Sequence, residues 1–365
     1  MKKIIRRKTR CVKIGRLKIG HAYPVAVQSM LKAKARDLEV AVSQIKKLAD
    51  AGCDIVRVAI EERQDALAIK HIKRHVDIPI VADIHFSYRL ALEAIDAGVD
   101  KIRLNPGNIY KPLEVKEVIA AAKSAHIPIR IGANSGSLRE TDKDKARALV
   151  KSVLDYLKLF EKCGFNDIVI SLKGSDILET IAAYERMASL CDYPLHVGVT
   201  ATGLPLDGVI KSSLGIGVLL FQGIGDTIRV SLLGDPLQEV LTAQVMLNSL
   251  GLRKFGPEWI CCPTCGRCEV DLYKKARGFE DLLKGLKRHE RDRLRYYKIA
   301  LMGCVVNGPG EAKEATCGLA FSKQKAVLFK KGKIVRSVAL DKAEEALFGM
   351  LKKDISGKGR KDEGR

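Results

Sequence analysis

Residues 77–105 read DIPIVADIHFSYRLALEAIDAGVDKIRLN. Each end of this stretch is a short run of aliphatic residues, and the segment between them carries apolar residues at helical spacing. Polar side chains follow at the ends of the runs, with Asp83 and His85 after the first and Arg103 and Asn105 in the second. A β-rich run, a helix and a second β-rich run are typical of a βαβ unit, so the two strands are predicted to be parallel.

The same unit repeats along the first 235 residues of the chain. Eight β-rich runs occur, at residues 24–30, 54–60, 78–84, 100–105, 127–133, 167–173, 195–200 and 227–232. Eight alternations of strand and helix predict a (β/α)8 barrel of the TIM type. An open doubly wound sheet is the alternative, but no glycine-rich dinucleotide turn follows the first run.

Active sites of such barrels lie at the carboxyl ends of the strands, where this chain places five cations. They are Arg57, Arg103, Arg130, Lys173 and Arg229. A cation on a buried strand is costly unless it is paired, and Asp83 can neutralise only part of this charge. Ion pairing within the barrel is one interpretation. The favoured one is an anionic ligand such as a diphosphate, because arginine forks match phosphate oxygens.

The whole chain has an excess of positive charge. Its 365 residues contain 64 Lys and Arg against 43 Asp and Glu, a formal charge of +21. This balance favours anionic partners, either nucleic acid or phosphorylated metabolites, although an aromatic content of 5% weakens base stacking. No apolar stretch is long enough to span a bilayer, and the basic N-terminus lacks the apolar core of a secretory signal. We therefore expect a cytoplasmic protein without membrane association.

The last third of the chain differs from the rest. Six of the ten cysteines fall there, namely Cys261, Cys262, Cys265, Cys268, Cys304 and Cys317. The strand–helix alternation also stops, and the pattern predicts a strand at 297–306, a hairpin at 326–338 that turns at Lys331 and Gly332, and a helix at 341–351. The predicted organisation is a barrel over residues 1–250, a small α+β metal-binding domain over 251–351 and a disordered charged tail over 352–365.

Two segments carry the metal chemistry: Cys261-Cys-Pro-Thr-Cys-Gly-Arg-Cys268 and the glycine-rich stretch that begins at Met302. A structural zinc site would use Cys262, Cys265, Cys304 and Cys317. The spacing of Cys261, Cys265 and Cys268 also fits a radical S-adenosylmethionine motif, but such motifs lie near the first barrel strand. The third interpretation is a 4Fe–4S cluster with three thiolates and a labile fourth position.

Several long motifs occur in one order along the chain. They are AVQSM (26–30), GCDIVRV (52–58), VADIHF (81–86), IRLNPGNI (102–109), IPIRIGANSGSL (127–138), KSSLGIG (211–217), GIGDTIRVSL (223–232), CPTCGR (262–267) and GCVVNGPGEA (303–312). With these motifs the chain resembles the bacterial two-domain form of the 4-hydroxy-3-methylbut-2-enyl diphosphate synthase family, iron–sulfur oxidoreductases of the non-mevalonate isoprenoid pathway. The similarity covers residues 6–351.

The resemblance implies a reaction and a cofactor. The reaction is the two-electron reductive ring opening and dehydroxylation of 2-C-methyl-D-erythritol 2,4-cyclodiphosphate to 4-hydroxy-3-methylbut-2-enyl diphosphate. Flavodoxin or ferredoxin would supply the electrons. One 4Fe–4S cluster per chain would be held by Cys262, Cys265, Cys304 and Glu311, with Glu311 yielding its iron to substrate. The family also implies a head-to-tail homodimer in which the cluster of one subunit serves the barrel of the other.

The resemblance also implies roles for residues of the barrel. Phosphate oxygens would be bound by the following residues: Arg57, Arg103, Asn105, Arg130, Asn134, Lys173, Arg229 and Ser231. Asp83, His85 and His196 would line the sugar end and pass protons, although a histidine bonded within the barrel core is an equal alternative.

The chain departs from the family pattern in a few positions. Ala201 stands where the family commonly has Glu, so that residue cannot donate a proton here, and Leu31 replaces a common Thr. Cys261 and Cys268 are additional; they are either inert or able to rescue or mis-ligate the cluster under oxidation. Cys317 is expected to be inert. Two rival classes remain: a zinc-stabilised nucleic-acid-binding protein, which leaves the barrel unexplained, and a dihydropteroate-type pterin barrel, which leaves the cysteine domain unexplained.

Overall fold

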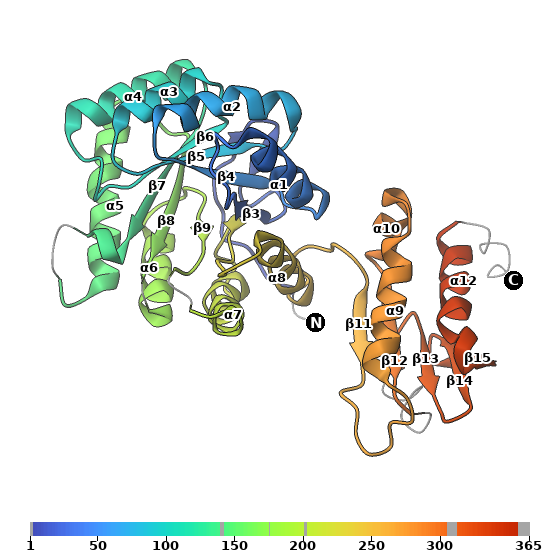
Figure 1. The fold of residues 1–365 in the computed structure, drawn as a ribbon. Coiled ribbons are helices and arrows are strands. Elements are labelled where there is room, and N and C mark those ends of the chain that lie inside the picture. The colour runs from blue at the N-terminus through green and yellow to red at the C-terminus, as the bar shows by residue number, and fades with distance from the viewer. Residues whose placement is uncertain (1–2, 139–141, 175, 201–202, 305–311, 357–365) are drawn as a thin grey trace, which may run out of the picture. The chain divides into compact units, whose positions relative to one another are not determined.

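The structure is a computed structural model that describes residues 3–138, 142–174, 176–200, 203–304 and 312–356 (Figure 1). It divides into two compact units, residues 1–253 and 254–365. Among the described residues, no helix has the length and apolar character needed to cross a membrane.

The first unit confirms the predicted barrel. Its eight parallel strands are β3 (Ala26–Met30), β4 (Ile55–Ile60), β5 (Ile80–Ile84), β6 (Lys101–Leu104), β7 (Ile129–Asn134), β8 (Ile168–Lys173), β9 (His196–Val197) and β10 (Thr227–Ile228). The hydrogen-bonded order is β8-β7-β6-β5-β4-β3-β10-β9. An isolated parallel bridge between Ile170 of β8 and Leu195, directly before β9, nearly closes the ring.

Eight helices cover the outside of these strands (Figure 1). They are α1 (Leu38–Asp50), α2 (Arg63–His75), α3 (Tyr88–Asp96), α4 (Pro112–Ser124), α5 (Lys145–Lys162), α6 (Ile177–Leu190), α7 (Pro205–Phe221) and α8 (Pro236–Ser249). Local sequence sets where several of them begin. Asp176 caps α6 and Asp235 caps α8 through backbone N–H groups, and prolines occupy the first turns of α4, α7 and α8.

The strand register places the polar side chains on the inner face of the barrel. Asp83 pairs with Arg103, and Arg103 pairs with Arg130. Directly paired residues of neighbouring parallel strands point to the same face of a sheet. Gly132 of β7 provides the space that Arg103 needs, because a Cβ at that position would lie 2.7 Å from the Arg103 Nε.

A hairpin that the sequence did not predict closes the amino-terminal end of the barrel. It consists of β1 (Val12–Ile14) and β2 (Leu17–Ile19). Its buried side chains pack against Ala26, Ile55, Val81 and Val169 at or near the starts of four barrel strands. Two strands of three residues are too short for a periodic pattern to stand out.

The second unit is a five-stranded sheet with helices, as the predicted α+β class requires. The strands are β11 (Glu258–Cys261), β12 (Lys298–Met302), β13 (Cys317–Phe321), β14 (Lys325–Lys330) and β15 (Lys333–Ala339), in that order, and the helices are α9 (Leu272–Lys284), α10 (Arg288–Leu294) and α12 (Ala343–Ile355). β11, β12 and β13 are parallel, and the remaining pairs are antiparallel. The sequence reading did not identify β11, β13, α9 or α10.

The predicted β14–β15 hairpin turns at Lys331 and Gly332, whose φ angles of 49° and 74° fit a tight two-residue turn. Helix α12 runs to Ile355, beyond the expected boundary at residue 351, because Ile355 is buried in the core of this unit. The rest of the predicted tail, residues 357–365, lies outside the described residues.

Candidate active site and candidate metal centre

The carboxyl ends of the barrel strands surround a cavity of about 190 Å³. Nine of the predicted site residues line it: Arg57, Asp83, His85, Arg103, Arg130, Asn134, Lys173, Arg229 and Ser231. Residues from β4, β5, β6, β7 and β8 therefore converge on one small space, as the barrel topology requires.

Asp83 is the central carboxylate of this cavity. Its Oδ2 lies 3.6 Å from Arg57 Nε and 3.4 Å from His85 Nε2, and its Oδ1 lies 3.2 Å from Arg103 Nη1. Burial alone would raise the pKa of Asp83. Arg57, the hydrogen bond with His85 and Arg103 outweigh burial and hold that pKa well below its usual range. Asp83 is therefore ionised at neutral pH and neutralises part of the charge of two arginines.

Two buried cations of the cavity lack such a partner among the described residues. Arg130 is 1% exposed, and its Nε and Nη1 have no hydrogen-bond partner. Lys173 is 6% exposed and makes no hydrogen bond or ion pair to a described residue. Burial lowers the pKa of Lys173, and nearby Arg57 and Arg229 lower it further. Uncompensated buried charge costs several kcal/mol, so this cavity favours an anionic ligand.

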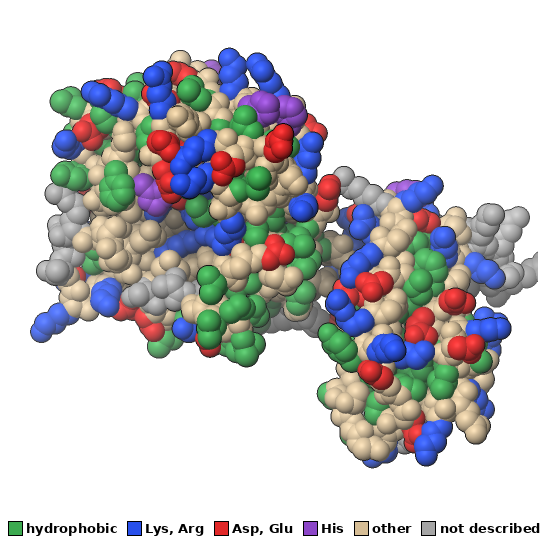
Figure 2. Space-filling model, viewed as in Figure 1, with side chains coloured by type: hydrophobic (Ala, Val, Ile, Leu, Met, Phe, Trp, Pro, Cys, Tyr) green, Lys and Arg blue, Asp and Glu red, His purple; other side chains and the backbone are tan. Residues whose placement is uncertain are grey.

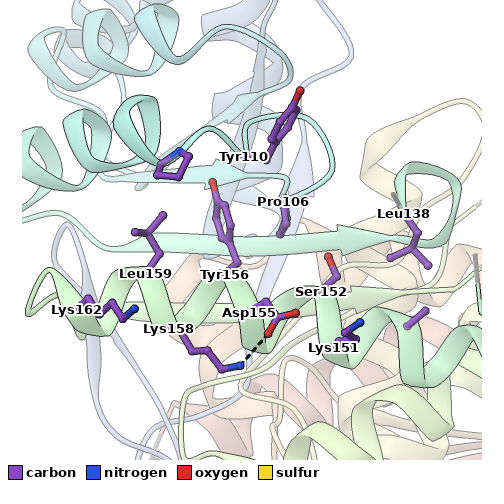
Figure 3. A pocket seen from close by; sticks show the side chains of 12 residues that line it. Pro106, Tyr110, Leu138, Lys151, Ser152, Asp155, Tyr156, Lys158, Leu159 and Lys162 are labelled. Atoms are coloured by element: carbon purple, nitrogen blue, oxygen red, sulfur yellow. Dashed lines mark hydrogen bonds and ion pairs between the residues drawn. The ribbon is translucent and has the colours of Figure 1, made fainter. Parts of the chain in front are cut away.

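The barrel also has a larger groove, of about 680 Å³, on its outside beside α5 (Figure 3). Lys151, Lys158 and Lys162 of α5 line it, and Lys158 Nζ lies 2.9 Å from Asp155 Oδ1. None of the predicted site residues that the structure describes lines this groove. We therefore place the candidate active site in the smaller cavity at the strand ends.

The cysteine motifs meet at one edge of the second unit because β11 and β12 are neighbouring parallel strands. Cys262 follows β11 directly, and its N–H donates to the Leu301 carbonyl over 3.1 Å. Cys304 follows β12 by two residues. Cys265 lies in the loop after β11. Further along this loop, the Glu269 N–H donates to the Gly303 carbonyl over 3.3 Å, and this bond joins the loop to the segment that contains Cys304.

The thiol donors at this edge fit an iron–sulfur cluster in their chemistry. Thiolates are the usual ligands of such clusters, and the Thr264 N–H points to Cys262 Sγ over 3.4 Å, as backbone donors do around cluster sulfurs. Within the described ranges, no three His, Cys, Asp or Glu side chains lie close enough together to hold a metal ion. Glu311, the predicted fourth ligand, lies outside the described residues.

Cys317 does not lie at this edge. It begins β13, which is parallel to β12, so it lies at the opposite end of the sheet from Cys304. Its side chain is fully buried in the core, and burial raises the pKa of the thiol to about 12. The zinc site with Cys317 as fourth ligand is thereby disfavoured.

Both units match family models. Residues 9–244 match a family described as the GcpE TIM-barrel domain, and residues 258–353 match the GcpE protein C-terminal domain. The chain belongs to the GcpE family.

The GcpE assignment agrees with full-length relatives. The 4-hydroxy-3-methylbut-2-en-1-yl diphosphate synthase (flavodoxin) of Caldanaerobacter subterraneus subsp. tengcongensis is 50% identical over 356 residues, 96% of this chain and 97% of the relative. The protein of the same name from Nitratidesulfovibrio vulgaris is 50% identical over 341 residues, 92% of this chain and 86% of the relative.

Solved structures of another enzyme share only the barrel fold. A dihydropteroate synthase from Xanthomonas albilineans superimposes with a TM-score of 0.51 at 12% identity, over 67% of this chain and 99% of the other. The Yersinia pestis enzyme gives a TM-score of 0.50 at 15% identity, over 66% and 98%.

Two residues predicted for the GcpE site do not line the cavity. His196 is fully buried, and its Nδ1 lies 2.8 Å from Thr227 Oγ1. Burial lowers the pKa of His196 well below its usual value, and Arg130 and Lys173 lower it further, so the ring is neutral at pH 7. Asn105 lines an adjoining groove and donates from Nδ2 to Ser137 Oγ over 2.9 Å.

Glu239 of α8 is a site residue that sequence reasoning missed. It is 1% exposed, and Arg229 Nη2 and Lys32 Nζ each lie 3.1 Å from its Oε1. Its Oε2 accepts from Ser29 Oγ over 3.0 Å, and its Oε1 from the Leu232 N–H over 3.1 Å. Burial alone would raise the pKa of Glu239. The nearby Arg229 and Lys32 have the larger effect, so the pKa lies below its usual value. Glu239 lies in the first turn of a helix, where an acidic residue is common and signals no site.

Lys101 was also missed. It is the first residue of β6, two positions before Arg103, whereas the site residues are predicted at the carboxyl ends of the strands; its side chain is fully buried. Its Nζ has no hydrogen-bond partner among the described residues. Burial lowers the pKa of Lys101 well below its usual value, and Arg130 and Arg57 lower it further.

Proposed function

We propose that this protein is a flavodoxin-dependent 4-hydroxy-3-methylbut-2-enyl diphosphate synthase that acts on 2-C-methyl-D-erythritol 2,4-cyclodiphosphate. The enzyme class follows from the full-length relatives, whose names state the product and the electron donor. The observation that supports a diphosphate substrate is the cavity at the strand ends, where Arg130 and Lys173 are buried and form no ion pair with a residue that the structure describes. A cyclic diphosphate would supply the missing negative charge.

The five cations of the cavity have two different roles in the proposed binding of the substrate. Arg57 and Arg103 are held in place by Asp83, and Arg229 is held by Glu239, so these three arginines present oriented guanidinium groups. Arg130 and Lys173 remain available for phosphate oxygens. Asn134 and Ser231 line the same cavity and can donate further hydrogen bonds, as can Asn105 from the adjoining groove.

His85 is the proposed proton donor of the barrel. Its side chain is 46% exposed at the cavity, and Asp83 orients its Nε2. His196 is neutral and buried, which suits a positioning role within the barrel rather than exchange of protons with solvent. Ala201, which replaces the family glutamate, lies outside the described residues.

Cys262, Cys265, Cys304 and Glu311 are the proposed ligands of one 4Fe–4S cluster per chain. When bound, the cluster would supply electrons one at a time to the substrate carbon that loses its hydroxyl. Reduced flavodoxin, or ferredoxin in its place, would deliver those electrons. The acidic character of such carriers would complement the charge of +21 of this chain. The proposed location is the cytoplasm, where cysteines remain reduced.

Replacing Lys173 with methionine tests the substrate proposal. We expect the Kd of the cyclic diphosphate to rise about 10- to 100-fold, because the loss of one hydrogen bond to a charged group weakens binding by about that factor. Binding would be measured by calorimetry on anaerobic holoprotein, with turnover followed under reduced flavodoxin. Lys158→Met removes a lysine from the outer groove and is the matched control, expected to leave binding unchanged. A large effect of Lys158→Met with none of Lys173→Met would place the substrate in the outer groove instead.

The homodimer implied by the resemblance needs an apolar contact surface, and α7 with α8 offers one. Five large apolar side chains of α7 are exposed in a stripe, at Leu206, Ile210, Leu214, Val218 and Phe221. Leu241 and Val245 of α8 extend it across a groove of about 530 Å³, and Figure 2 shows hydrophobic side chains gathered over these helices. Exposed apolar patches of this kind mark interaction sites, and we propose a second copy of this chain as the partner.

Leu214→Asp is expected to convert this dimer into monomers, because a carboxylate would be desolvated at the centre of the interface. Light scattering coupled to size-exclusion chromatography measures the mass directly. The control is Leu113→Asp, at a leucine of α4 that is 75% exposed and lies outside the apolar stripe of α7 and α8. A wild-type protein that is monomeric at all concentrations, or a Leu214→Asp dimer, would refute this interface.

A further inference from the structure

Cys265 and Cys268 form the two ends of a hydrogen-bonded turn. The Cys268 N–H donates to the Cys265 carbonyl over 2.9 Å, with Gly266 and Arg267 between them. A turn closed by this bond holds its first and fourth Cα atoms within about 7 Å. Disulfides span Cα separations of up to about 6.8 Å, so the pair needs little or no backbone movement to be bridged.

The two thiols differ in their access to solvent. Cys265 is exposed, whereas Cys268 is half-buried and its Sγ donates to the Val270 carbonyl over 3.2 Å. Cys268 Sγ also lies directly against Gly303, where a Cβ would approach it to 2.5 Å. Because Gly303 precedes Cys304, the Cys268 thiol lies beside the proposed cluster ligands, although it is not one of them.

The other CxxC pair of the loop lacks this geometry. Across the described residues 262–265, no backbone hydrogen bond closes a turn from Cys262 to Cys265. Thr264 instead has a φ of 68°, and its N–H points to Cys262 Sγ. The local backbone therefore favours Cys268 over Cys262 as the disulfide partner of Cys265.

We propose that Cys268 is a resolving thiol that protects Cys265 when the cluster is absent. The Cys265 thiolate attacks hydrogen peroxide and the O–O bond breaks. One oxygen stays on the sulfur as the sulfenic acid, and the other leaves as hydroxide, which takes up a proton to give water. The Cys268 thiol then attacks the Cys265 sulfur, a disulfide forms, and the sulfenic oxygen leaves as a second water. The two electrons lost by the thiols are those gained by peroxide.

The disulfide matters because it is reversible. Without a resolving thiol, the sulfenic acid is oxidised further to sulfinic and sulfonic acids, which thiols do not reduce. A dithiol reduces the Cys265–Cys268 disulfide and returns Cys265 as a ligand for cluster assembly. This role rests on the proposed function in that Cys265 is taken as a cluster ligand.

Peptide mapping after peroxide treatment tests the pairing itself. The full-length chain would be freed of iron with a chelator under anaerobic conditions, treated with one equivalent of peroxide, alkylated and digested with trypsin. Cleavage after Arg267 separates Cys265, in peptide 255–267, from Cys268, in peptide 268–274. We expect the two peptides to be joined by a disulfide, and fragmentation to assign it to Cys265. A Cys262–Cys265 disulfide, which stays within peptide 255–267, would overturn the proposal.

The variant Cys268→Ser tests the protection. After peroxide and then dithiothreitol, we expect sulfinic and sulfonic acid at Cys265, and at least about fivefold less iron taken up on reconstitution than wild type. Cys261→Ser, an extra cysteine of the same loop, is the matched control and should recover as wild type does. Equal recovery of Cys268→Ser and wild type would refute the protective role. The mapping needs neither cluster nor turnover, so its result is independent of whether the proposed reaction occurs.

Discussion

Cys304→Ser is expected to remove the proposed iron–sulfur cluster and with it the activity. Cys304 follows β12, at the same edge of the sheet as Cys262 and Cys265, and a serine hydroxyl is a far weaker ligand of iron than a thiolate. We expect about four irons and four sulfides in the wild-type chain and less than about one of each in the variant. Turnover should fall more than about 100-fold, since even substitutions of residues that contact the ligands, without binding the metal themselves, reduce activity by up to about that factor.

Iron and sulfide analysis on protein purified without oxygen measures the first effect, and a flavodoxin-coupled assay measures the second. Cys261→Ser changes the residue beside Cys262 and is expected to retain full iron content. One zinc per chain without sulfide in the wild type would contradict the cluster proposal. Full iron in Cys304→Ser would remove Cys304 from the ligand set.

Asp83→Asn is expected to destabilise the barrel more than any other single change in the cavity. Asp83 is 3% exposed and faces Arg57 and Arg103, so the variant leaves two buried arginines without their shared counter-charge. Breaking a buried ion pair by removing one partner costs about 3–5 kcal/mol of unfolding free energy. Urea unfolding of the barrel, with Asp155→Asn on the outer surface as the control, measures this difference.

The pH dependence follows from the lowered pKa of Asp83. The folded pKa lies below the unfolded value of about 3.9, so the stabilisation is complete above that value and is lost as pH falls through the folded pKa. The difference between wild type and Asp83→Asn should therefore be constant from pH 6 to 8 and shrink only in acid, below about pH 4. A difference that is already small at pH 7 would show that Asp83 does not balance the two arginines.

Part of the positive charge in the cavity is not neutralised by carboxylates of the described residues and can attract an anionic ligand. Asp83 neutralises part of the charge of Arg57 and Arg103, and Glu239 neutralises Arg229. Arg130 and Lys173, by contrast, form no ion pair with a carboxylate of the described residues. An anion that enters the cavity meets two desolvated cations in a low-dielectric space, where the attraction is strong. The same cations destabilise the empty barrel, so ligand binding is expected to stabilise the folded protein.

The sequence alone predicted the barrel, most of its helices and nine of the residues that line the cavity. The strand and helix periods are local properties of the chain, and polar residues at strand ends fall at one mouth once the strands are parallel. The CPTC motif and Cys304 likewise indicated a metal centre. The short strands β1, β2, β11 and β13 and the seven-residue helix α10 were not predicted, because runs this short carry little periodicity. Helix α9 was missed although Leu272, Phe279 and Leu283 recur in it at helical spacing.

Only the tertiary structure decided which charges are paired and which cysteines share an edge. Glu239 reaches Arg229 from α8, and His196 is buried below the cavity rather than within it. Cys317 is a cysteine like Cys304, yet the parallel register of β12 and β13 places it at the opposite end of the sheet. The physical reason is common to all three: a pairing between elements depends on strand register and helix packing, which bring together residues that no local pattern in the sequence relates.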